Sequence, residues 1–303
     1  MAIFKRSLLT LLSLVILLVL VFFLSRLTGD PSYLFLPVNA TPEARAAFAA
    51  QNGFDQPLMV QFLRYVGDVF TGEFGTSLRQ QRPAIDVALE AFPVTLKLAA
   101  VTLAIAIAAA VVAGSLAAYR PRGLVDRTIG VTSLAGASAP DFWVAITLVL
   151  VFSVGLEILP TSGMGGPLTW ILPVIVLGLR PFGLLVQVVR GSMIAALSAP
   201  YTKTARSKGA SEGRVIFVHA LRNSTLPVIT VAGDIAASLI NGAVIVETIF
   251  GWPGIGGVMI NAILQRDFAV IQATILVTAI AILILNIGID LLYRFLDPRV
   301  RFA

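Results

Sequence analysis

The most restrictive feature of this sequence is a series of apolar stretches, each long enough to cross a lipid bilayer as a helix. A bilayer core about 30 Å thick requires about 20 apolar residues at helical rise. With 57% hydrophobic and 13% charged residues and a mean hydropathy of +0.92, the chain is too apolar for an ordinary soluble domain. We predict an all-α integral membrane protein with six transmembrane helices. They lie at about residues 8–27, 94–119, 129–156, 168–189, 226–248 and 269–292.

The first and fourth stretches each allow a second interpretation. Lys5 and Arg6 precede the first stretch, as in a signal peptide. Its apolar part exceeds the usual length of about 7 to 15 residues, which favours an uncleaved membrane span. The fourth stretch contains Pro173, Arg180 and Pro181, and it is the least regular of the six.

Composition also bears on the ligands that the chain can hold. The chain has no cysteine and one histidine, so it offers no disulfide and no thiolate ligands for a metal. We predict no metal site. The net charge of +6 requires no nucleic-acid partner, because membrane topology accounts for the basic residues.

The Lys and Arg residues are distributed unevenly among the loops. Basic residues in short loops mark the cytoplasmic side of a membrane protein. An amino terminus in the cytoplasm places 14 of the 22 Lys and Arg residues there and six outside. We therefore predict that both termini are cytoplasmic. Residues 1–92 would form the first helix and a long periplasmic loop, and residues 93–303 a five-helix core with a cytoplasmic loop at about 190–225.

The longest cytoplasmic loop contains the segment YTKTARSKGASEGRVIFVHALRNSTLP, residues 201–227. It resembles two short helices separated at Gly209. Ser211 suits the N-cap of the second helix, since its hydroxyl accepts a backbone N–H bond, but Arg214 excludes a reciprocal capping box. The simplest alternative is a solvated basic linker.

The order of several motifs identifies a resemblance. Together with RLTGDP, GFDQPLMVQFLRY, GEFGTSL, LPTSG, VETIFGWPGIG and FLDPRVR, the cytoplasmic loop resembles the permease subunits of ABC importers in the dipeptide, oligopeptide and nickel group. The resemblance implies a type I ABC importer permease fold in the bacterial inner membrane. It also implies translocation of a substrate, most simply a di- or oligopeptide. Nickel chelates, glutathione, opines and oligosaccharides remain open as substrates.

The same resemblance implies particular partners. They are a second homologous permease subunit, two ATPase subunits, a periplasmic substrate-binding protein and the membrane lipid. The sequence has no Walker-type phosphate loop, so ATP and Mg would bind to the ATPase subunits and no cofactor to this chain.

In such importers, the cytoplasmic loop forms a coupling helix that contacts the ATPase. Against the general permease pattern of Glu-Ala-Ala followed by Gly, this sequence keeps Ala205 and Gly209 but has Lys203 and Thr204 at the first two places. Any salt bridge assigned to the missing Glu is therefore in doubt. The resemblance assigns the contact to Lys203, Thr204, Ala205, Arg206, Ser207, Lys208, Gly209 and Ala210, and we include Glu212.

Two charges fall at comparable depths within the predicted spans. Arg180 precedes Arg190 by ten residues, and Asp234 follows Pro227 by seven. An ionised side chain in mid-bilayer costs about 2.5 to 3.5 kcal/mol on insertion scales. We hypothesise that Arg180 and Asp234 pair or jointly line the substrate cavity; a purely structural ion pair is the alternative.

The glycine-rich segment after the fifth span lacks the residues that phosphate binding requires. It is typical of a rigid outward turn. The resemblance places it near the outer mouth of the permease, as a candidate outer gate formed by Phe250, Gly251, Trp252, Pro253 and Gly254.

Two other classes of function remain as alternatives. An intramembrane protease requires paired carboxylates or a Ser-His site at membrane depth, whereas His219 lies in the cytoplasmic loop and Asp234 lacks a suitable carboxylate partner. A secondary transporter would use Arg180 and Asp234 for ion coupling, and a measurement of whether uptake depends on ATP would distinguish it from an importer. The sequence therefore favours a transport subunit that is not itself an enzyme.

Overall fold

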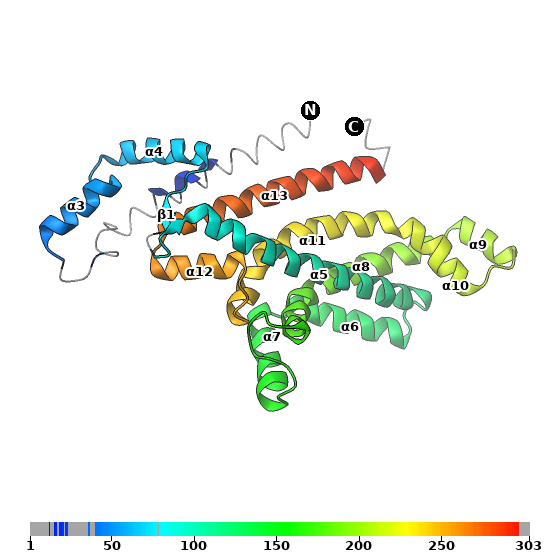
Figure 1. The fold of residues 1–303 in the computed structure, drawn as a ribbon. Coiled ribbons are helices and arrows are strands. Elements are labelled where there is room, and N and C mark those ends of the chain that lie inside the picture. The colour runs from blue at the N-terminus through cyan, green and yellow to red at the C-terminus, as the bar shows by residue number, and fades with distance from the viewer. Residues whose placement is uncertain are drawn as a thin grey trace. The chain divides into compact units, whose positions relative to one another are not determined.

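The computed structural model describes residues 40–77 and 79–296, together with isolated positions between 12 and 36. Most of the described chain is helical (Figure 1). Four helices are long and apolar enough to cross a membrane: Ala84–Tyr119, Pro167–Ser198, Glu212–Ile249 and Phe268–Ile289. They confirm helices at the second, fourth, fifth and sixth predicted stretches. The first predicted stretch, about 8–27, lies largely outside the described residues.

The third predicted stretch is not one continuous helix. It consists of α6 (Leu124–Ser138) and a second helix from Asp141 to Gly155, and the two are bent by 103°. Pro140 explains the break, because a proline disfavours helical geometry at the residue before it. Ala139 is extended, with ψ 135°. The span predicted at 129–156 is therefore a bent pair of helices, and whether the pair forms one span stays a prediction.

Contacts divide the chain into two compact units. The first comprises Met1–Val94 and Gly254–Leu283. Its small antiparallel sheet pairs Thr76 with Pro83 and Ser77 with Arg82. The described elements are α3 (Pro42–Asn52), α4 (Leu58–Thr71), β1 (Thr76–Ser77), β2 (Arg82–Pro83), the start of α5 (Ala84–Tyr119), α12 (Ile255–Gln265) and the start of α13 (Phe268–Leu296).

A buried polar contact ties the sheet of the first unit to the start of α13. The Ser77 hydroxyl donates to Asp267 Oδ2 at 2.5 Å, and both residues are buried. The same hydroxyl accepts the Gln80 backbone N–H at 2.9 Å. The first unit also has an apolar core that includes Phe74, Ala84, Ile255, Val270 and Ala273.

The second unit comprises Thr95–Pro253 and Ile284–Ala303. Helix α8 (Ile171–Ser198) packs against both α6 and α11 (Leu221–Ile249). Leu185, Val189 and Met193 recur at every fourth position of α8 and are fully buried, as helix packing requires. The remaining elements are α7 (Asp141–Leu148), a π-helix at Val149–Gly155, a 3-10 turn at Pro167–Trp170, α9 (Pro200–Ser207), α10 (Glu212–Arg214) and a π-helix at Val215–Ala220.

Candidate functional site

The predicted coupling segment forms a short helix and a sharp turn. Pro200 occupies the first turn of α9, where its missing N–H leaves no internal bond unmade. The buried Thr202 hydroxyl donates to the carbonyls of Leu197 and Ala199 at 2.9 and 2.7 Å. This contact fixes the start of α9 against the end of α8.

Gly209 ends this helical segment in a left-handed conformation, with φ 82°. Its N–H donates to Arg206 O at 2.9 Å, and the Ala210 N–H donates to Ala205 O at 3.1 Å. A side chain is disfavoured at this φ. Apart from Gly209 and its two chain neighbours, no described atom lies within 4 Å of a Cβ built at Gly209. The glycine is therefore needed for the turn, and the space beside it is open.

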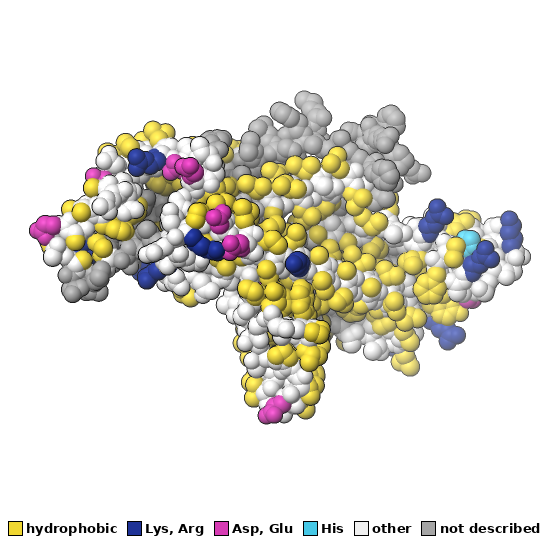
Figure 2. All heavy atoms as spheres, viewed as in Figure 1, with side chains coloured by type: hydrophobic (Ala, Val, Ile, Leu, Met, Phe, Trp, Pro, Cys, Tyr) yellow, Lys and Arg dark blue, Asp and Glu magenta, His cyan; other side chains and the backbone are white. Residues whose placement is uncertain are grey.

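Most of the predicted contact residues are exposed. Ala205 and Ala210 are half-buried and the rest lie open to solvent. Figure 2 shows Lys and Arg side chains gathered with the single histidine at the α9–α10 end of the chain. The segment thus presents a basic, glycine-containing tip. The exposed members of the predicted set are Lys203, Thr204, Arg206, Ser207, Lys208, Gly209 and Glu212.

The second half of the loop differs from the prediction in two respects. The helix that begins at Glu212 does not end before the fifth span but continues to Ile249. Ser211 occupies the N-cap position, yet its side chain makes no capping hydrogen bond. Glu212 instead accepts two bonds from Arg206, at 2.8 and 3.2 Å, which bridge the turn at Gly209.

The hydrogen bonds from Arg206 also change the pKa of the Glu212 carboxyl. Glu212 precedes the fifth predicted span, and hydrogen bonding from Arg206 lowers the pKa of its carboxyl. The Arg206–Glu212 pair therefore holds the turn closed while Glu212 is ionised. Since both side chains are exposed, the pair is accessible to solvent and salt.

No ion pair among the described residues joins Arg180 to Asp234. Both side chains are exposed in the single chain. Arg180 interacts electrostatically with Asp141, the first residue of α7. Their comparable depth in the membrane stays a prediction. A shared cavity remains a prediction.

The candidate outer gate is a packed turn. Phe250 and Trp252 are each only 2% exposed. Trp252 packs edge-on against Trp170, with ring centroids 4.8 Å apart. The Phe250 carbonyl accepts the Gly163 N–H at 2.8 Å. These contacts fix the turn within the second unit, and its role as a gate remains a prediction.

Two buried carboxylates in the second unit were missed in the sequence. Asp126 of α6 accepts a bidentate pair from Arg190 of α8, one bond of which is 2.8 Å long, and also the Arg122 backbone N–H at 2.7 Å. Glu247 of α11 is completely buried and accepts the Thr95 hydroxyl at 2.5 Å. The signal for Glu247 was present, because an acidic residue inside an apolar run requires a partner.

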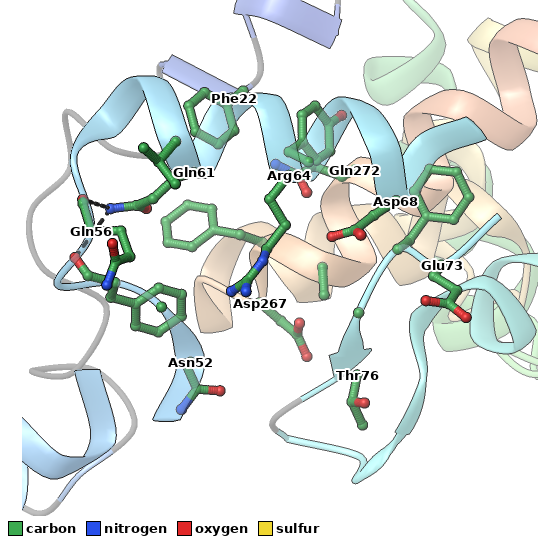
Figure 3. Close-up of a pocket in the computed structure, with 18 of the residues that line it drawn as sticks. Phe22, Asn52, Gln56, Gln61, Arg64, Asp68, Glu73, Thr76, Asp267 and Gln272 are labelled. Carbon is green, nitrogen blue, oxygen red and sulfur yellow. Dashed lines mark hydrogen bonds between the residues drawn. The ribbon is translucent and has the colours of Figure 1, made fainter. Parts of the chain in front are cut away.

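A cavity in the first unit was also not predicted. Its volume is about 580 Å³, and it lies between α4, the end of α3, the segment before β1 and the start of α13. Figure 3 shows Arg64 reaching from α4 into this space, with Asp68 beside it and Asp267 opposite. No group of three or more potential metal ligands occurs within the part of the chain that the structure describes.

The helices, the exposed basic tip and the ordered motifs define a class of protein, the membrane-spanning permease subunit of an ABC importer. Comparison with known protein families shows the family to which this chain belongs. Residues 110–302 match the binding-protein-dependent transport system inner membrane component, and residues 1–99 match the corresponding N-terminal region. The chain belongs to this family.

Individual relatives cover nearly the whole chain. A putative peptide transport system permease protein of Brucella abortus is 37% identical, over 94% of this chain and 93% of the relative. The oligopeptide permease AppB of Bacillus subtilis is 36% identical, over 90% of each chain. The dipeptide permease DppB of Escherichia coli is 35% identical, over 92% of each chain.

Solved structures support the fold alone. A chain of the MetNI methionine ABC transporter aligns with a TM-score of 0.58 at 13% identity, covering 70% of this chain and 96% of that one. A chain of an amino acid ABC transporter gives a TM-score of 0.53 at 15% identity, with coverage of 69% and 94%. The type I permease fold predicted from the sequence is thereby confirmed. A permease of this kind works with ATPase and binding-protein partners.

Proposed function

We propose that this chain is the permease through which short peptides enter a bacterial cell across its inner membrane, after delivery by a periplasmic binding protein. The relatives named as peptide, oligopeptide and dipeptide permeases support this substrate class. The observation that carries the mechanism is the exposed turn at Gly209, which leaves open space for a partner.

The assembly that we propose contains a second, homologous permease subunit and two ATPase subunits. ATP and Mg bind to the ATPases, and this chain binds no cofactor. The exposed charges of Arg180 and Asp234 support the second permease. An ionised side chain facing lipid is costly, so both residues are expected to face a partner or a water-filled path. We assign them to the translocation cavity.

Reconstitution tests the proposed function. Proteoliposomes containing both permeases and the ATPases should accumulate trialanine only when ATP is inside and the binding protein outside. Uptake driven by an ion gradient without ATPase subunits would favour a secondary transporter instead.

Charge reversal tests the assignment to the cavity. Arg180→Glu and Asp234→Arg should each reduce the uptake rate while the complex still assembles. Because no ion pair joins them, the double reversal should not restore uptake. Restoration would show that the two residues act as a pair, and wild-type uptake in both single variants would remove them from the cavity.

A further inference from the structure

The cavity of the first unit is of the size that small ligands occupy. Pockets for small molecules usually have volumes of about 300 to 1,000 Å³, and this one has about 580 Å³. Its lining residues come from 50–76 and 267–272, apart from Phe22. Much of that lining belongs to the loop that the charge distribution places outside the membrane, where substrate arrives.

The buried wall of the cavity contains polar atoms without partners. Tyr65 is 9% exposed and stacks on Phe22, with centroids 5.4 Å apart, and its hydroxyl makes no hydrogen bond among the described residues. Burial raises the pKa of Tyr65 to about 12, so the hydroxyl keeps its proton and can donate. Gln61 donates to the carbonyls of Phe54 and Gln56, but its Oε1 is buried and lacks a partner.

Such atoms are available to a ligand. Buried polar groups nearly always have hydrogen-bond partners, because leaving them unpaired costs free energy. The Tyr65 hydroxyl can donate to a carbonyl and Gln61 Oε1 can accept from an N–H. A peptide unit carries both of these groups.

The charged side chains around the opening are also unpaired. Among the described residues, the side chains of Arg64, Asp68 and Glu73 make no ion pair and no hydrogen bond, although the Asp68 carbonyl accepts the Thr71 hydroxyl at 3.1 Å. Arg64 and Asp68 are four residues apart on α4, a spacing that usually favours pairing. Asp267, by contrast, is engaged by Ser77. One cation and two anions are therefore available to a ligand.

Gly53 makes room for the Arg64 guanidinium. A Cβ at this position would lie 2.7 Å from Arg64 Nη1, and the backbone has φ 70°. The guanidinium consequently lies against the carboxyl end of α3, which Gly53 caps. The dipole of that helix favours a cation there, so the exposed Arg64 side chain is positioned at the cavity.

We propose that this cavity binds a short peptide with free termini. Arg64 binds the carboxylate, Asp68 and Glu73 bind the ammonium group, and Tyr65 and Gln61 bind the peptide unit between them. The site gives the permease its own affinity for substrate, separate from that of the binding protein. The choice of a peptide over other zwitterions rests on the proposed function.

Equilibrium binding of radiolabelled trialanine tests the site. The transporter is purified with its membrane and ATPase subunits but without the binding protein. Wild type should bind trialanine saturably, and Arg64→Gln should weaken binding about tenfold or more. Arg79→Gln is the matched control, because Arg79 is exposed in the same unit and does not line the cavity. It should bind as wild type does.

Modified peptides test the same site without depending on the folding of a variant. Trialanine amide and N-acetyltrialanine should each compete about tenfold less well than trialanine for the wild-type transporter. In Arg64→Gln, trialanine and its amide should bind equally. No saturable binding to wild type, or equal competition by the amide, would overturn the site.

Uptake of trialanine with the binding protein present is measured in parallel. Uptake without direct binding means that the proposed site is wrong while the proposed function stands. Direct binding without uptake means that the site exists and the proposed transport function is wrong.

Discussion

The α6–α8 interface and the α9–α10 turn each contain an Arg–carboxylate pair, but the two pairs have different surroundings. At the interface, the side chains of Arg190 and Asp126 are 30% and 6% exposed. At the turn, those of Arg206 and Glu212 are 38% and 45% exposed. The positive-inside rule had placed both arginines in the same cytoplasmic set. Their contacts show that one fastens two helices together and the other closes a solvated turn.

This difference follows from what surrounds each pair. Asp126 also accepts a backbone N–H, so its removal would leave several donors without an acceptor in a packed interface. Water can replace either partner at the turn. The stability of the protein should therefore depend on the Arg190–Asp126 pair. The response to an ATPase partner should depend on the turn that contains the Arg206–Glu212 pair.

Breaking the interface pair should have the largest effect. Asp126→Ala should destabilise the protein by about 2 to 3 kcal/mol, because hydrogen bonds to a charged group are lost and Arg190 is left unpaired. The melting temperature of the purified complex measures this loss. Arg127→Gln, which removes an exposed charge from the same helix, should leave the melting temperature near that of wild type. Equal losses in both variants would contradict the distinction between the two pairs.

Adding bulk at the turn should alter coupling more than stability. Gly209→Ala and Gly209→Trp share the strain of a positive φ, about 1 to 2 kcal/mol, but only Trp fills the open space beside the turn. Gly209→Trp should lower peptide uptake per ATP hydrolysed about tenfold relative to Gly209→Ala, a difference of about 1.4 kcal/mol. The measurement is uptake and ATP hydrolysis in the same proteoliposomes. An unchanged ratio between the two variants would mean that no partner approaches Gly209.

Removing the exposed pair should have the smallest effect. Glu212→Gln should leave the melting temperature close to that of wild type, because solvent replaces the lost contact. In wild type, the pKa of Glu212 is lowered, so the Arg206–Glu212 pair contributes its full stability at pH values above the ordinary glutamate pKa of about 4.3. This stability is lost as the pH falls through the lowered pKa of Glu212.

A fluorescent label can follow this titration at the turn. The chain has no cysteine, so Lys203→Cys provides a unique attachment point. Its signal should change in acid in the wild-type background but not in Glu212→Gln. The same transition in both backgrounds would assign it to another group.

Much of the fold could be predicted because few backbone structures can span a lipid bilayer. Long apolar runs form helices wherever lipid offers no other hydrogen-bond partner, so the four long helices matched their predicted stretches. The bend in the third stretch was missed because hydropathy alone does not register the conformational effect of Pro140. At Ser211, the N-cap position was correct but the capping bond was not, since local propensity does not include the Arg206–Glu212 contact.

The sites were harder to predict because side-chain direction depends on tertiary packing. Arg180 and Asp234 were assigned comparable depths, yet Arg180 has its electrostatic interaction with Asp141. Tyr65 and Asp267 line one cavity although about 200 residues separate them. No periodicity in a single sequence links such positions.

The continuity of the helix from Glu212 to Ile249 has a mechanical consequence. Its 38 residues span about 57 Å at helical rise, so one helix extends from the exposed turn at Gly209 to the buried Glu247. Because no loop separates this turn from the predicted fifth span, a displacement of the turn would be passed along the helix. The π-helical turn at Val215–Ala220 and Pro227 are irregular points along it, and bending at either would determine how much of an ATPase stroke reaches the other end of the helix.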